Sequence, residues 1–385
     1  MHLRLRLPQP TWKSDIPLVI GGLTGVAAIA HLGPSGDATS LQGLCWTGWL
    51  TLCVLVCAFR AMAHADRLAE RAGEPMGTII LTVAAITIEI AAVCAVVLKD
   101  GGATTIARDS MFAVLMLILN GLIGGCMLVG CWKSGEQAFN PRSASAYLSM
   151  IFVLAAITLV LPRFTRSEVG GWMSDSMEVF VGGGSLAIYM GFLWLQGSTY
   201  RGMFVSDEPH KHELPDHVGR SSLYGTIAIL AVSLIIVVLC AEGVGGRVPA
   251  LLDAMHLPNA LVGVWIAAMV LTPEGFAALR ASKRGNMQRS INVLLGSALA
   301  TIGLTVPALL ALRWVFAMDL EFGLEAPYIV LLASTFLISC VSLLSGRVNA
   351  IHGFVHVLLF LAWIATILDE STVANVQAVV TTGPR

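Results

Sequence analysis

Long apolar runs separated by short polar connections occupy the chain from residue 16 to residue 368. A membrane-spanning helix needs about 20 mostly apolar residues, because lipid offers no partner to an unpaired backbone group. Runs that meet or approach this length cover residues 16–32, 41–63, 76–98, 106–131, 146–162, 178–197, 223–242, 258–280, 288–316, 326–345 and 350–368. The pattern predicts an all-α polytopic membrane protein with about 11 transmembrane helices.

The first run admits a second interpretation. Arg4 and Arg6 precede a short apolar stretch that ends in Ala28-Ile29-Ala30, which is the layout of a signal peptide. Pro17 and the prolines before it are unusual in such a peptide. Whether this first helix is retained stays open, but its removal would not reverse the orientation of the other helices.

The composition excludes a soluble globular protein. Of 385 residues, 56% are hydrophobic and 12% are charged, against about 45–50% and about 25% in soluble domains. A net charge of −1 without long runs of one sign argues against a nucleic-acid partner. The eight cysteines lie in or beside apolar runs without C-x-x-C spacing, so we interpret them as small apolar residues.

The cationic residues predict the orientation in the membrane. Most of the 23 lysine and arginine residues fall in connections on the side of the N-terminus. By the positive-inside rule, the N-terminus is predicted to be cytoplasmic and the C-terminus outside. The expected location is a cell membrane, which the chain crosses many times.

One connection, residues 198–222, is markedly hydrophilic, and it divides the last ten runs into five and five. Because five is odd, two related five-helix units joined in this way must have opposite orientations, as in many secondary transporters. The expected organisation is an N-terminal segment with the first helix (1–40), a first repeat (41–197), the hydrophilic loop (198–222), and a second repeat with the C-terminal tail (223–385).

Two carboxylates interrupt the apolar runs, and each lies in the second helix of its five-helix half. Glu89 has no basic residue within nine positions on either side, and the cation nearest to Glu274 in sequence is Arg280, six residues on. An ionisable residue within a spanning helix costs at least a few kcal/mol, so it indicates a functional site. Burial and mutual repulsion would keep two such acids from staying charged together without a cation or a proton. Alternate occupancy by one Ca²⁺ or by protons would make an antiporter.

Several oxygen groups accompany the two acids. Thr78 and Thr82 share a helical face with Glu89. Pro273 has no N–H, which leaves the carbonyl of Met269 without its helical donor. Carboxylate, hydroxyl and carbonyl oxygens are ligands for hard cations.

Polar residues also mark the helix that follows each acid. In the first half, Asn120 is the deepest amide of that run. In the second half, Ser297 shares a face with Ser290, Thr301 and Thr305. Hydrogen bonding between helices is the alternative role for these hydroxyls. We count Asn120 and Ser297 among the candidate cation or proton ligands.

Several stretches give a specific resemblance. They are Glu74-Pro75-Met76-Gly77 leading to Glu89, Thr272-Pro273-Glu274-Gly275, residues 288–307, and Gly346-Arg347-Val348-Asn349 leading to His356. Over most of residues 60–369 the chain resembles the ChaA-type bacterial Ca²⁺:H⁺ antiporters, a branch of the calcium/cation antiporter superfamily.

The resemblance implies that Glu89 and Glu274 form one site shared by the cation and protons, with alternating access. It also implies a bacterial inner membrane, Ca²⁺ and H⁺ as transported ions, and no cofactor. Related exchangers carry Gly-Asn before each acid, where this chain has Ala85-Ile86 and Val270-Leu271. Since some ChaA-like proteins are associated with Na⁺ or K⁺ exchange, a monovalent cation:proton antiporter is the alternative.

Histidines supply two weaker signals. His352 and His356 share one face of the last run, and His356 could relay protons. The hydrophilic loop could be a solvated linker or a metal or pH sensor. Its candidate residues are Asp207, Glu208, His210, His212, Glu213, Asp216 and His217.

Two other classes remain as remote alternatives. An intramembrane enzyme is disfavoured because the chain has no H-E-x-x-H or G-x-S-x-G motif. A cation channel would not need buried acids that become neutral on protonation. The expected partners are the lipid bilayer, Ca²⁺ and protons, with Na⁺ or K⁺ as alternatives, and the sequence leaves the oligomeric state open.

Overall fold

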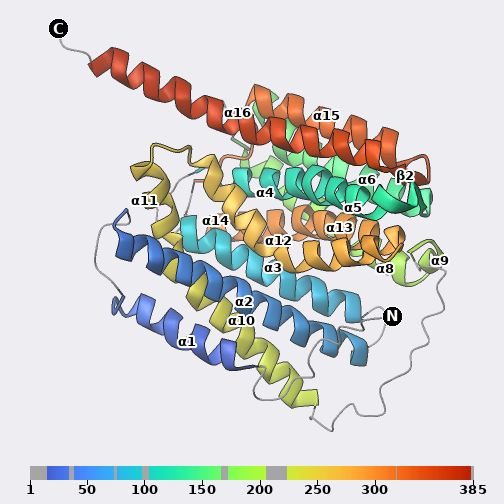
Figure 1. Cartoon of the computed structure of the whole chain (residues 1–385), viewed down its shortest axis with the longest axis horizontal. Coiled ribbons are helices and arrows are strands. Elements are labelled where there is room, and N and C mark those ends of the chain that lie inside the picture. Colours follow the sequence, from blue (N-terminus) through green and yellow to red (C-terminus); the bar gives the residue numbers. More distant parts are fainter. Residues whose placement is uncertain are drawn as a thin grey trace. The chain divides into compact units, whose positions relative to one another are not determined.

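The computed structural model describes residues 15–33, 39–72, 76–97, 104–165, 172–204, 223–317 and 319–382. Nearly all of them are helical (Figure 1). The elements are α1 (Ile16–Ile29), α2 (Leu41–Ala72), α3 (Met76–Val97), α4 (Ile106–Met116), η2 (Leu117–Leu122), α5 (Ile123–Ser134), β1 (Glu136–Ala138), α6 (Pro141–Ala155), η3 (Ala156–Val160), α7 (Leu161–Phe164), α8 (Asp175–Gly197), α9 (Arg201–Phe204), α10 (Leu223–Gly245), α11 (Arg247–Ala254), α12 (Ala260–Lys283), α13 (Met287–Ala300), η4 (Thr301–Thr305), α14 (Val306–Phe316), α15 (Ala326–Leu343), β2 (Arg347–Asn349) and α16 (Ala350–Thr382).

The predicted fold class is confirmed. Within the described residues, 10 helical segments are long and apolar enough to cross a membrane, and α1 is a shorter apolar helix of 14 residues. Segments η2, η3 and η4 are π-helical turns inside longer helices. The apolar pattern did not predict these turns, because one extra residue per turn barely alters the sequence period. Such turns are frequent at functional sites.

Close contacts divide the chain into two compact units. Unit 1 comprises Met1–Lys99 and Val218–Leu251, and it contains α1, α2, α3 and α10. Unit 2 comprises Asp100–His217 and Leu252–Arg385, and it contains the remaining long helices. Each unit takes helices from both halves of the sequence. The five-plus-five repeat boundaries stay a prediction from helix order.

Unit 1 is built around α10, which packs against α1, α2 and α3. Small residues allow α1 to approach closely, since Gly21 faces Cys57 of α2 and Gly25 faces the backbone of Cys240 on α10. This Gly-x-x-x-Gly spacing is typical of helix pairs in membranes. Ala84 of α3 is buried with Leu68 of α2 and Leu230 of α10.

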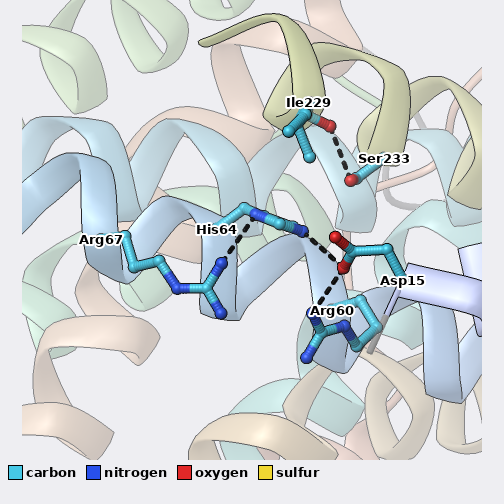
Figure 2. Close-up of polar contacts among 6 residues, drawn as sticks. All are labelled: Asp15, Arg60, His64, Arg67, Ile229 and Ser233. Atoms are coloured by element: carbon cyan, nitrogen blue, oxygen red, sulfur yellow. Dashed lines mark hydrogen bonds and ion pairs between the residues drawn. The ribbon is translucent and has the colours of Figure 1, made fainter. Parts of the chain in front are cut away.

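Polar contacts fix the start of α1 to α2 (Figure 2). Asp15 accepts hydrogen bonds from Arg60 and from Nε2 of His64, which lies 3.1 Å away. Arg67 donates to the other ring nitrogen of His64 at 3.2 Å. Although burial raises the pKa of Asp15, its contacts with Arg60 and His64 outweigh that effect, so the net pKa lies below the ordinary 3.8.

Unit 2 has two polar ends. At one end β1 pairs with β2 antiparallel, Gln137 donates to the carbonyl of Ser282, and Asn292 donates to the carbonyl of Phe204. At the other end Arg108 pairs with Glu321, and Leu324 donates its N–H to the carbonyl of Leu159. Connections predicted to share one side of the membrane therefore do lie together within unit 2.

Candidate cation and proton site

Glu89 belongs to unit 1, where the apolar helix α3 carries it. Its exposed fraction is 3%, and its neighbours Ile88, Ala92 and Val93 are buried as well. Glu89 follows Ala84 by five residues, so it lies on a different face from the one that packs against α2 and α10. Thr82 is half-buried on the same helix, and the side chain of Thr78 lies outside the described residues.

Glu274 belongs to unit 2 and lies half-buried on α12. Helix α12 is one α-helix from Ala260 to Lys283, with Pro273 inside it. Met269, four residues before Pro273, is buried at 3% exposure. Its carbonyl still lacks the donor that proline cannot supply, so Met269 stays a candidate ligand.

Two glycines bring α12 against the helix formed by α4, η2 and α5. A Cβ at Gly263 would lie 2.7 Å from the backbone of Asp109, and a Cβ at Gly275 would lie 2.9 Å from the side chain of Leu122. From the first contact to the second, the residue numbers rise along both helices. Glu274 is next to Gly275, so it lies beside the π-helical turn η2.

Asn120 lies inside η2 and is fully buried. Its amide nitrogen donates to Oγ1 of Thr335 at 2.8 Å, and its Oδ1 lies 3.3 Å from Nδ1 of His356. Nε2 of His356 lies 2.8 Å from Oγ of Ser342. The structure therefore joins two predicted residues, Asn120 and His356, in one buried network.

The Oδ1 atom of Asn120 can only accept, so Nδ1 of His356 is the donor in that contact, and Nε2 of His356 shares a hydrogen bond with the Ser342 hydroxyl. The Ser342 hydroxyl also lies 2.9 Å from the carbonyl of Ile338. The network links α15, α16 and η2, and it gives Asn120 a structural role whether or not its oxygen also binds a cation.

The serines and threonines predicted to share one face of the helix after Glu274 have different surroundings. Ser290 donates to the carbonyl of Ala278 at 2.7 Å, which ties α13 to α12. Ser297 is half-buried on α13, while Thr301 and Thr305 are buried in η4. Both halves thus carry a π-helical turn in the helix after the acid, and Ser297 stays a candidate ligand.

The hydrophilic loop is not covered by these observations. Its candidates Asp207, Glu208, His210, His212, Glu213, Asp216 and His217 lie outside the described residues. Among the residues that are described, no group of three or more His, Cys, Asp or Glu side chains could hold a metal ion.

Sequence reasoning missed a further carboxylate and three ion pairs. Glu242 is the last residue of the predicted run 223–242, but α10 continues to Gly245. Applying the rule for acids inside apolar runs to a longer window would have found it. Arg108 pairs with Asp109 and Glu321, and Arg313 pairs with Glu178. Glu321 and Glu178 are far in the chain from Arg108 and Arg313, so periodicity gives no signal for those two pairs.

Comparisons with known proteins agree with this architecture. The family described as "Sodium/calcium exchanger protein" matches residues 43–197 and 225–368. The ionic transporter y4hA of Sinorhizobium fredii is 35% identical, over 91% of this chain and 94% of the relative. The sodium-potassium/proton antiporter ChaA of Escherichia coli is 33% identical, over 82% of this chain and 86% of the relative.

A solved structure extends the likeness to the fold. The native structure of YfkE, a Ca²⁺/H⁺ antiporter protein, matches with a TM-score of 0.70. The match covers 92% of this chain and 99% of that one at 16% identity, which supports the fold alone. The chain is a multi-pass membrane transporter and not an enzyme: it belongs to the sodium/calcium exchanger protein family, and so to the cation antiporters of the calcium/cation antiporter superfamily.

Proposed function

We propose that the chain exchanges Ca²⁺ for protons at one site formed by Glu89 and Glu274. The carrying observation is that each acid lies within a spanning helix, Glu89 at 3% exposure and Glu274 beside η2. Two ionised carboxylates carry two negative charges. One Ca²⁺ or two protons neutralises them, and neutralisation removes most of the cost of their burial.

Exchange follows from this competition. Protonation lowers the affinity for the cation, because a neutral carboxyl group is a poor ligand for Ca²⁺. Arrival of Ca²⁺ in turn displaces the protons. Thr82, Thr78, Asn120, Ser297 and the carbonyl of Met269 are proposed to complete the oxygen shell. Access would alternate between the two sides of the membrane.

A second candidate is exchange of Na⁺ or K⁺ for protons. The supporting observation is the 33% identical relative that is named a sodium-potassium/proton antiporter. One monovalent cation would leave one negative charge on the two acids, so this candidate requires either two cations or one cation together with one proton.

The proposed setting is a bacterial inner membrane with the N-terminus in the cytoplasm and the C-terminus outside. The concentration of lysine and arginine in the connections on the N-terminal side supports this orientation. Attaching a reporter enzyme that is active on one side only to each connection would test it.

The experiment on function uses purified protein in liposomes with an imposed pH gradient and an internal pH dye. Ca²⁺, Na⁺ and K⁺ are added separately, and Glu274→Gln protein is the control. Collapse of the gradient by micromolar Ca²⁺, absent from the control, would support Ca²⁺/H⁺ exchange. A response to Na⁺ or K⁺ alone would select the second candidate. No response to any of the three cations would contradict both.

A further inference from the structure

We propose that His64 is a proton-binding site, distinct from the two acids, and that its protonation displaces Arg67 while α1 stays attached to α2. The site belongs to unit 1 and lies where the start of α1 meets α2. Figure 2 shows His64 between Asp15, the residue before α1, and Arg67, which lies on the next turn of α2. Arg60 completes the cluster from the preceding turn of α2. None of these four residues is assigned to cation exchange.

The hydrogen bonds fix the protonation state of His64. Nη1 of Arg67 lies 3.2 Å from Nδ1 of His64. A guanidinium group has no acceptor, so it donates, and Nδ1 must keep its lone pair. The ring proton therefore lies on Nε2, which is 3.1 Å from Oδ1 of Asp15 and donates to it. In this arrangement His64 is a neutral ring held between an anion and a cation.

A second proton can bind to the ring only at Nδ1. It would make Nδ1 a donor that faces another donor, the guanidinium of Arg67, and it would bring two like charges together. The contact between Arg67 and His64 would then be lost. The contact with Asp15 would become a pair of opposite charges, which favours the protonated ring and keeps α1 attached. Proton binding is thus coupled to the position of Arg67, which is the element with two arrangements.

Opposing charges act on His64. Among the described residues they are one carboxylate, Asp15, and two guanidinium groups, Arg60 and Arg67. Asp15 favours uptake of a proton by the ring, whereas the two cations oppose it. Arg60 donates to Asp15, so Arg67 is the cation that faces the lone pair of the ring. Departure of Arg67 therefore removes the charge that most directly opposes proton binding.

The other helices packed here bring no charge to the ring within the part of the chain that the structure describes. Helix α10 contributes Ser233, whose hydroxyl donates to a carbonyl of its own helix (Figure 2). The side chains of α3 that pack near this part of α2 include Ile80 and Leu81. His64 is 2% exposed, and burial opposes a charged ring, but the side chain of Asp15 is 28% exposed. Protons can therefore reach the cluster from the side of Asp15.

Nuclear magnetic resonance of protein labelled with nitrogen-15 in its histidines tests the site directly. Spectra are recorded in detergent from about pH 8 to about pH 4, and the signal missing from His64→Gln protein is that of His64. We expect the ring proton on Nε2 at the upper pH and uptake of a proton at Nδ1 as the pH falls. A single proton on Nδ1 at the upper pH, or no uptake over this range, would overturn the proposal.

Variants of Arg67 test the coupling. Arg67→Gln should raise the midpoint pH of the His64 titration, with about a tenfold gain in proton affinity, because the amide is uncharged and its oxygen can accept from Nδ1. Arg67→Lys keeps a cation that only donates, so its midpoint should stay close to that of wild type. The matched control is Arg71→Gln, which removes the same charge one turn further along α2, where Arg71 donates to Thr226. Equal shifts in Arg67→Gln and Arg71→Gln would reduce the effect to net charge and contradict the proposal.

Asp15→Asn provides a shift of opposite sign. The midpoint pH of the His64 titration should fall in this variant, because Nε2 loses its anionic acceptor. A purely structural role of the cluster would not move the midpoint in opposite directions in Asp15→Asn and Arg67→Gln. Thermal unfolding of each variant shows that it is folded. Shifts of the same sign in the two folded variants would contradict the proposal.

Discussion

The two acid-bearing helices occupy different surroundings. In unit 1, α3 packs against α2 and α10 through small and aliphatic side chains, and Gly245 approaches the carbonyl of Ala95. In unit 2, α12 is also tied by hydrogen bonds, from Ser282 to the carbonyl of Cys126 and from Ser290 to the carbonyl of Ala278. Glu89 and Glu274 thus lie in similar apolar runs, but the helix of Glu89 is held by apolar packing and the helix of Glu274 is also held by hydrogen bonds.

This difference allows the role of the carboxyl groups to be tested apart from the role of the contacts that hold their helices. The carboxyl groups should be equally necessary, because neutralising either one removes one of the two charges. The surroundings should not be equivalent, because hydrogen bonds and ion pairs within unit 2 can be removed one at a time. The following predictions test this distinction.

The largest expected effect is loss of exchange in both acid variants. Glu89→Gln and Glu274→Gln should each reduce cation-driven proton flux in liposomes to the level of protein-free vesicles, because an amide cannot bind and release the proton. Thermal unfolding in detergent should show that both variants stay folded. Near-normal flux in either variant would contradict a shared site.

The next effect concerns the support of unit 2. Glu178 is buried at 2% exposure, and it accepts from Arg313 and, at 3.0 Å, from Nε1 of Trp314. Glu178→Gln should lower the free energy of unfolding by about 3 kcal/mol, because it leaves a partly buried cation without its counter-charge. The measurement is thermal unfolding, with Asp175→Asn on the exposed first turn of α8 as a control. An unchanged melting temperature for Glu178→Gln would show that the pair contributes little.

A smaller loss is expected from the buried amide network. Asn120→Leu should destabilise unit 2 by about 1–3 kcal/mol, because Thr335 and His356 each lose a buried partner. If Asn120 also binds the cation, the half-maximal cation concentration for flux will rise too. Flux and unfolding measured on the same preparation separate the two roles. Wild-type stability of Asn120→Leu would contradict a structural role for Asn120.

Thr82→Val should have a milder effect on the side of α3. Loss of one hydroxyl ligand should raise the half-maximal cation concentration a few-fold while the maximal flux stays similar, because the carboxylates remain. Thr87→Val is the matched control, since the Thr87 hydroxyl donates to the carbonyl of Val83 in its own helix. Equal behaviour of the two variants would exclude Thr82 from the site.

The smallest effect concerns Asp15 and the attachment of α1. Because the pKa of Asp15 is lowered in the folded chain, its contribution is present above pH 3.8 and is lost as the pH falls through the lowered value. Asp15→Asn should therefore lower the melting temperature slightly at pH 7, and this effect should disappear as the pH falls through the lowered pKa of Asp15. If the melting temperatures of wild type and Asp15→Asn still differ in acid, the effect comes from the shape of the side chain and not from its charge.

The apolar pattern alone predicted most of the fold. Spanning helices must satisfy their backbone within each segment, so the length of a run predicts a crossing directly. The run 106–131 corresponds to the helix formed by α4, η2 and α5, and the run 288–316 to the helix formed by α13, η4 and α14. The two-stranded ribbon of β1 and β2 was not predicted, because three-residue strands from distant connections have no usable period.

The candidate site was predictable only as a set of residues. An acid within an apolar run is conspicuous, so Glu89 and Glu274 followed from the sequence. Asn120 followed from its depth in its run, and His356 from the helix face that it shares with His352 and from the family resemblance. Their partners did not follow, because Thr335 and Ser342 are far away in the chain and resemble any other hydroxyls of a spanning helix.

The sequence by itself determined the class of protein, the number of long helices and the residues too costly to bury without a function. Those features depend on local composition and on the energetics of transfer into lipid. The tertiary structure decided which helices form each unit, that α12 passes Pro273 without breaking, and that His356 binds Asn120. These depend on close packing at glycines and on hydrogen bonds between distant segments, which no local pattern encodes.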